Sequence, residues 1–427
     1  MESRKLGFIA VALGDQALVS GANFLLLVAV SRCGDSADLA RYALTYTVVV
    51  FVGCVHLALI LQPLGMLLPE RDGAKSASYL ATLARLHHRC ALVGAALALL
   101  AAWLHGPLSL VGWGAAACAA RIAQEYERRA AYCLQDNRRA LLIDLTTYVP
   151  LSLAAIALVM LRPEAGAITG LALLTLGNLL GAATGAVLNR GAVKAIPDPL
   201  KPILREHWEV GRWLVGGALL AALSDHLHPF LIAGILGLHE TALLAAARSL
   251  TSIGNVAING FDAYAGPRLR QLAISGGLPA LRAATISTGA LLIGSLLVVC
   301  VPLLAAPRWL MGVIYGDTYQ AGWWLLAAFA VIFLVRGVNK LLGLVLLALK
   351  RPGSGFIAIA INAMATTVTA PFLVQAYGLK GAVVGLGANA VVITVVLGIG
   401  VARAWRQARA HGVDRVAGRK DPGIADV

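Results

Sequence analysis

The chain has 427 residues, of which 59% are hydrophobic and only 13% are charged, and its mean hydropathy is +0.79. Soluble domains contain about 25% charged residues. A soluble core of this size could not bury so much apolar surface, because surface falls slowly as chain length grows. The composition therefore excludes a soluble enzyme, a nucleic-acid-binding protein and a disordered chain. It predicts an all-α polytopic membrane protein.

A spanning helix needs about 20 mostly apolar residues, and the sequence contains twelve such runs. In chain order they are Leu6–Ser31, Leu39–Leu68, Cys90–Leu104, Leu108–Tyr132, Leu141–Leu161, Ala165–Leu188, Trp213–Leu238, Glu240–Phe261, Ala283–Ala305, Ala321–Leu349, Gly353–Ala376 and Gly381–Arg403. The first run is too long for a signal peptide and has no clean cleavage site, so it is predicted to remain as a span.

The net charge of +14 has a topological explanation. The N-terminus, the even-numbered loops and the C-terminal tail carry 27 of the 35 Lys and Arg residues, when Arg121, Arg128 and Arg129 near the end of the fourth run are counted with the loop after it and Arg403 with the tail. Lys and Arg concentrate on the cytoplasmic side of a membrane protein. The pattern therefore predicts a multi-pass protein with both termini in the cytoplasm, and it requires no nucleic-acid partner.

The longest loop between spans, residues 189–212, contains three prolines and divides the spans into two sets of six. We expect an N-terminal six-helix bundle over residues 1–190, a cytoplasmic linker over 191–212, a C-terminal six-helix bundle over 213–403 and a basic tail over 404–427. The halves also share a G-A-x-x-G-L motif at Gly166 and Gly381, which open spans six and twelve. This match indicates parallel repeats about an axis along the membrane normal.

Ionisable residues within the apolar runs are the candidate site residues, because such residues are costly in a bilayer and often mark transport paths. Arg336 and Lys340 lie four residues apart on one face of span ten, and Arg248 lies in span eight. Asp225 in span seven has a depth similar to that of Arg248, so an ion pair between them is one expectation. The alternative is that Arg248 faces a water-filled cavity and meets an anionic substrate.

Two further features are candidates for coupling or gating. Asp225, His226, His228 and Pro229 lie close together in span seven, where the proline is predicted to interrupt and bend the helix. Asp15 makes the first span unusually polar; it is either solvated at the cytoplasmic end or a proton or cation site. Asp144 is interpreted as a residue at a helix end beside basic neighbours.

No motif predicts a metal or a cofactor. None of the six cysteines forms a C-x-x-C pair. The sequence G-x-x-x-x-G-K-[ST], with which a P-loop binds ATP, is absent. Deep basic residues outnumber deep acidic ones, which favours an anionic substrate such as a pyrophosphate group, because Arg binds phosphates through paired hydrogen bonds.

Several segments resemble the Wzx-type lipid-linked oligosaccharide flippases of the multidrug/oligosaccharidyl-lipid/polysaccharide (MOP) exporter superfamily. The segments are the first span from Asp15 to Phe24 with its continuation through Arg32 to Ala43, the turn from Ile235 to Ala242, the loop from Tyr315 to Ala321, and the G-A-x-x-G-L starts of spans six and twelve. The resemblance implies two six-helix bundles around a central cavity that opens alternately to either side of a bacterial inner membrane. It also implies an undecaprenyl-pyrophosphate-linked glycan as cargo, with membrane lipids and the polysaccharide polymerase or export machinery as partners.

The predicted function is therefore translocation of a lipid-linked oligosaccharide or polysaccharide precursor without covalent chemistry, with Arg248, Arg336 and Lys340 holding the pyrophosphate. One alternative is a cation-coupled multidrug or metabolite antiporter on the same fold, for which Asp15 or Asp225 would be the key carboxylate. A second alternative is a membrane enzyme of glycan assembly. It would need paired acidic residues at a membrane face, and the sequence offers no convincing pair.

Overall fold

The computed structural model describes residues 2–71, 73–103, 108–161, 164–190, 196–275, 277–349 and 351–410. Regular secondary structure in these ranges is entirely helical. The predicted tail from residue 411 onward and part of the predicted linker, residues 191–195, lie outside the described residues.

The N-terminal half consists of long helices joined by short turns. They are α1 (Glu2–Cys33), α2 (Ser36–His56), α3 (Gln62–Leu67), α4 (Gly73–Trp103), α5 (Leu108–Cys133), α6 (Asn137–Leu161) and α7 (Ala167–Leu188). A π-helical turn, Leu57–Leu61, joins α2 to α3, so these elements form one span with a bulge in its middle. A π-bulge leaves backbone groups without their usual helical partners.

The C-terminal half begins with α9 (Leu200–Ile235), which includes most of the segment predicted to be a linker. Helix formation at Leu200 was not predicted because of the three prolines. Pro197 and Pro199 precede the helix, and Pro202 lies in its first turn, where a missing N–H costs no hydrogen bond. Pro229 does not interrupt α9 either, because the helix continues to Ile235.

The remaining helices of this half are α10 (Leu238–Ser252), α11 (Asn255–Ser275), α12 (Gly277–Ala305), α13 (Pro307–Tyr315), α14 (Trp323–Ala348) and α15 (Pro352–Ala410). Helices α10 and α11 are separated by Ile253 and Gly254 alone. Helix α15 contains two limbs joined at Gly378, whose φ of 59° lies in the left-handed region that glycine adopts without strain.

The expectation of an all-helical polytopic membrane protein with about twelve helices is confirmed. Eight helical segments in the described ranges are long and apolar enough to cross a membrane, and one of them contains both limbs of α15. Large apolar side chains also point outward along the spans, among them Met160, Val298 and Phe372, each more than two-thirds exposed. Such surfaces are expected to face lipid.

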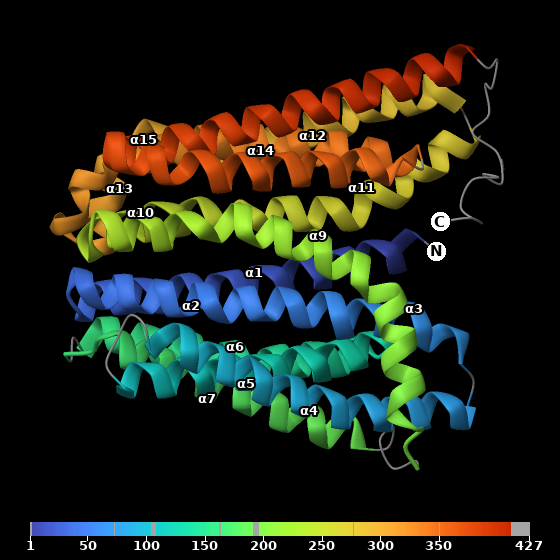
Figure 1. Ribbon diagram of the computed structural model, residues 1–427, viewed down its shortest axis with the longest axis horizontal. Coiled ribbons are helices and arrows are strands. Elements are labelled where there is room, and N and C mark those ends of the chain that lie inside the picture. The colour runs from blue at the N-terminus through green and yellow to red at the C-terminus, as the bar shows by residue number, and fades with distance from the viewer. Residues whose placement is uncertain are drawn as a thin grey trace.

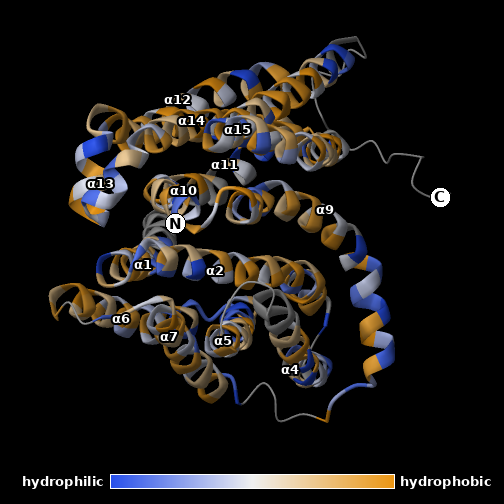
Figure 2. Ribbon diagram, turned by 60° about the vertical axis from the view of Figure 1, so that its left-hand side comes forward, coloured by the Kyte–Doolittle hydropathy of each residue, from blue (hydrophilic) through white to orange (hydrophobic). Residues whose placement is uncertain are grey.

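Figure 1 shows the two halves as separate layers, with α1, α2 and α4–α7 below and α9–α15 above. Helices α1 and α2 contact α9, α10 and α11 across the layer boundary. Helix α9 passes from the upper to the lower layer at the end where α1 begins and α15 finishes (Figure 1). We call this the basic end. Figure 2 shows the hydrophilic first turns of α9 outside the apolar bundle.

The halves are also joined at the opposite end. The Arg32 guanidinium at the end of α1 donates hydrogen bonds to the carbonyl oxygens of Val313 and Ile314 at the end of α13. Phe24 and Tyr315 meet edge to face with ring centroids 6.5 Å apart. These contacts close the opposite end of the interface between the halves.

Candidate functional site

Pro229 determines the hydrogen bonding of Asp225, four residues before it in α9. Because proline has no N–H, it cannot donate the helical hydrogen bond that the Asp225 carbonyl oxygen would otherwise accept. The Arg248 guanidinium of α10 donates to this oxygen over 2.8 Å. The local sequence of α9 thus provides a backbone acceptor that holds Arg248 in place.

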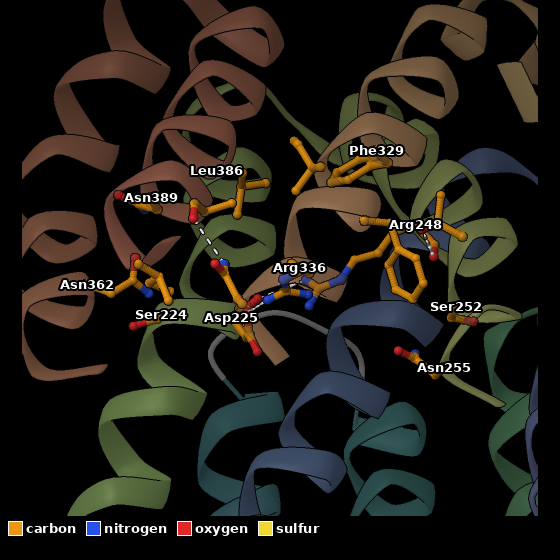
Figure 3. Close-up of a pocket in the computed structure, with 16 residues that line it drawn as sticks. Ser224, Asp225, Arg248, Ser252, Asn255, Phe329, Arg336, Asn362, Leu386 and Asn389 are labelled. Carbon is orange, nitrogen blue, oxygen red and sulfur yellow. Dashed lines mark hydrogen bonds and ion pairs between the residues drawn. The ribbon is translucent and has the colours of Figure 1, made fainter. Parts of the chain in front are cut away.

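The Asp225 carboxylate forms an ion pair with Arg336 of α14. The expected ion pair between Asp225 and Arg248 is therefore wrong. Arg336 pairs with the Asp225 carboxylate, and Arg248 contacts the Asp225 backbone. Figure 3 shows Asp225 and Arg336 directed toward one another, with Asn362 and Ser224 on one side and Ser252 and Asn255 on the other. One carboxylate thus lies between two arginines.

Amide side chains complete this polar cluster inside the C-terminal half. Asn339 donates to the Ala390 carbonyl over 3.0 Å and accepts from Thr394 over 2.6 Å, and Asn389 donates to Thr366 over 2.6 Å. The groups surround a small cavity of about 120 Å³. The space is sufficient for a few waters and too small for a headgroup.

A larger cavity of about 410 Å³ lies between the two halves, and we call it the central cavity. Its walls come from α1, α2 and α5 on one side and from α9, α10 and the start of α11 on the other. The described residues that line it include Arg121, Arg248 and His226 and no acidic residue. Of the three predicted substrate-binding residues, only Arg248 lines this cavity.

Arg121 contributes a second cationic side chain to the central cavity, and we did not predict it. It was counted among loop residues, but it lies within α5, as do Arg128 and Arg129. Its guanidinium donates to Tyr46 and contacts Glu125, both over 3.3 Å. The spacing of Arg121, Gln124 and Arg128 places them on one helical face, and this periodicity is the signal that could have identified them.

Lys340 lines another cavity, of about 590 Å³, toward the basic end. This basic-end cavity lies among α2, its π-helical turn, α9, α14 and α15, and it extends to Arg351. It shares Asp225 with the small cavity and His226 with the central one. Lys340 and Arg248 are therefore on the walls of different cavities.

A second charged cluster lies inside the N-terminal half. Arg128 contacts Asp15 over 2.8 Å and Asp144 over 2.7 Å. Gln124 also donates to Asp144 over 2.9 Å, and Tyr132 donates to Asp15 over 3.2 Å. Both carboxylates are buried. Asp144 lies two turns inside α6, so its interpretation as a helix-end residue is wrong, and its basic neighbour is Arg128 of α5.

His228 is 1% exposed, and neither of its ring nitrogens has a hydrogen-bond partner among the described residues. Its ring lies next to Gly385, close to the space that a β-carbon there would fill. His226, two residues earlier in α9, instead faces the central and basic-end cavities. The described residues contain no cluster of His, Cys, Asp and Glu suited to a metal ion.

No protein-family model and no curated protein sequence matches the chain. Solved structures do match over nearly its whole length. An inward-facing multidrug resistance MATE family transporter of the MOP superfamily is 16% identical, with a TM-score of 0.75 over 94% of this chain and 98% of that one. The lipid II flippase MurJ in an inward closed conformation is 11% identical, with a TM-score of 0.71 over 95% and 90%.

A MOP superfamily transporter from Pyrococcus furiosus is 13% identical, with a TM-score of 0.66 over 94% of both chains. The fold is that of the MOP superfamily transporters. These neighbours are transporters and a flippase rather than enzymes. They include multidrug transporters as well as a lipid flippase, so the shared fold does not specify a substrate.

Proposed function

We propose that the protein translocates a lipid-linked oligosaccharide, carried on undecaprenyl pyrophosphate, across a bacterial inner membrane by alternating access. Arg121 and Arg248 are the main support, because they line one cavity from opposite halves and no described acidic residue shares its walls. An anionic headgroup placed between them would contact both halves at once.

The conformation supports cargo entry from the basic end. The halves are joined at the opposite end through Arg32, while the basic-end cavity reaches Arg351 at the start of α15. With the basic end in the cytoplasm, this arrangement is the inward-facing state of an alternating-access cycle. The pyrophosphate would meet Lys340 first and Arg248 deeper, and the prenyl chain would remain in the bilayer. We keep Arg336 as a residue that positions Asp225.

The N-terminal carboxylates give specific support to a second candidate, a cation-coupled multidrug or metabolite antiporter. Asp15 and Asp144 share one arginine and are buried. An exchangeable proton at this pair would serve an antiporter, and it would equally serve a proton-driven flippase. The walls of the central cavity distinguish the two functions, because an organic cation is repelled by Arg121 and Arg248.

Flipping by the purified protein in proteoliposomes tests the proposal. A fluorescent undecaprenyl-pyrophosphate disaccharide is incorporated, and its exposure is followed by chemical quenching of the outer leaflet. We expect Arg248→Gln and Arg121→Gln each to slow flipping by at least tenfold, because a charge-assisted contact contributes about 1.5–3 kcal/mol. Arg282→Gln, which neutralises an exposed arginine of α12, is the matched control.

Unchanged flipping in both cavity variants would overturn the cargo assignment. The same vesicles loaded with ethidium test the antiporter. Proton-driven ethidium transport, combined with an absence of lipid flipping, would establish that alternative instead.

A further inference from the structure

The two limbs of α15 enclose a groove at the basic end that meets the basic-end cavity at Arg351 and shares no other lining residue with it. Its volume is about 420 Å³, and its lining includes Ile357, Ile361 and Ile399 along the two limbs and Arg351 and Arg403 at one end. Ile357 is 55% exposed and Ile399 is 46% exposed. Exposed isoleucines on a spanning helix face the acyl chains of the bilayer, so the groove opens toward lipid.

The polar residues of the groove are gathered at one end. Arg351 immediately precedes the first limb, and Arg403 lies in the last turns of the second limb. The described part of the chain places no carboxylate within 4 Å of either guanidinium. The mouth of the groove therefore carries two positive charges, and its wall is aliphatic.

The length of the groove corresponds to one leaflet. Ile361 lies ten residues after Arg351, which is about 15 Å along a helix. The hydrocarbon core of a bilayer is about 30 Å thick, so one leaflet is about half of that depth. A molecule with an anionic head at the arginines would extend its chain to the bilayer midplane.

We infer that this groove binds an anionic glycerophospholipid of the leaflet at the basic end, with its phosphate on Arg351 and Arg403 and an acyl chain against the isoleucines. Basic pockets between spanning helices on the cytoplasmic side are suited to acidic lipid headgroups. A bilayer phospholipid fits better than the proposed cargo, because the groove is one leaflet deep, shares no lining residue with the central cavity and shares only Arg351 with the basic-end cavity. The inference does not depend on the proposed function.

Native mass spectrometry of the purified protein, titrated with dioleoyl-phosphatidylglycerol or dioleoyl-phosphatidylcholine, tests the site. We expect one phosphatidylglycerol to bind more tightly than the others, and phosphatidylcholine to bind only weakly. Arg351→Gln and Arg403→Gln should each weaken this first binding about fivefold, because one basic residue contributes about 1 kcal/mol to binding of acidic lipid. Lysine in either position should retain most of the binding.

Arg406→Gln is the matched control, because Arg406 is an exposed arginine of the same helix that does not line the groove. Equal loss in this control and in the groove variants would mean that only the general positive charge attracts lipid, which overturns the site. Titration with undecaprenyl phosphate is the other arm. Tight binding of that lipid at the two arginines, with no preference for phosphatidylglycerol, would also overturn the inference.

Discussion

In the N-terminal half, one arginine, Arg128, contacts two carboxylates, whereas in the C-terminal half one carboxylate, Asp225, lies between two arginines. The N-terminal cluster does not line the central cavity, and the C-terminal cluster does so through Arg248. A bound proton lowers the energetic cost of an excess of buried carboxylates, and a bound anion lowers the cost of an excess of buried cations. The two clusters therefore differ in the sign of the charge that is in excess.

The largest expected effect is on the N-terminal cluster. Arg128→Met leaves two buried carboxylates without their cation, and removal of one partner from a buried charge network costs about 3–5 kcal/mol. We expect a large fall in the unfolding temperature of the detergent-solubilised protein. Adding Asp144→Asn to this variant should restore part of the loss.

Arg138→Met is the control for this measurement, because Arg138 is exposed at the start of α6. It should change the free energy of unfolding by no more than about 0.5 kcal/mol. If Arg128→Met is equally mild, the two carboxylates are not held by Arg128, and the contrast between the halves fails.

A smaller effect, on transport rather than stability, is expected in the C-terminal cluster. Asp225→Asn removes the partner of Arg336 and adds an unpaired cation beside the cavities. We expect lipid flipping to fall about tenfold. This change corresponds to about 1.4 kcal/mol, which lies within the range of about 0.5–3 kcal/mol for the coupling energy between residues in contact. The double variant Asp225→Asn/Arg336→Gln should recover most of the rate, because it removes the pair as a unit.

The double variant separates the two proposed functions. In a flippase that uses Asp225 to hold an arginine, removing both groups is tolerated. In an antiporter that uses Asp225 as its cation-binding carboxylate, the double variant stays as inactive as Asp225→Asn alone.

The sequence was sufficient for an all-helical membrane protein with about twelve helices, because most of the helices are long apolar runs. It was also sufficient to place Arg248 and Asp225 at similar depths, since rise per residue determines depth. It could not identify Arg336 as the partner of Asp225, because 111 residues separate them and helix rotation is set by packing. Arg128 was assigned to a loop because the arginine density of α5 concealed its helical periodicity.

The first turns of α9 connect the C-terminal half to the N-terminal half. The hydroxyl of Tyr79 in α4 lies 2.7 Å from His207 Nε2, and His207 Nδ1 lies 3.1 Å from the carbonyl oxygen of Leu59 in the π-helical turn. Arg71 pairs with Glu206 beside them. The Leu59 carbonyl can only accept, so Nδ1–H donates to it. Burial lowers the pKa of His207 and favours the neutral ring, in which Nε2 accepts from the Tyr79 hydroxyl.

The smallest expected effect is the pH dependence of this contact. Burial lowers the pKa of His207 from its ordinary value of 6.5, against weaker opposing effects of the Leu59 carbonyl and Glu206. A histidine with a lowered pKa in the docked state stabilises docking above its ordinary pKa, and this contribution is lost as pH falls toward the lowered value. We expect amide hydrogen exchange over residues 200–210, corrected for the intrinsic effect of pH, to quicken between pH 6.5 and pH 5.

His207→Gln is the discriminating variant, because its amide can donate and accept but does not titrate in this range. Its exchange rate over residues 200–210, corrected in the same way, should be independent of pH. The contact between the halves at the basic end would then weaken at low pH only in the protein that retains His207. An equal pH dependence in both proteins would mean that other groups, such as the Arg71–Glu206 pair, control the docking of α9 on the N-terminal half.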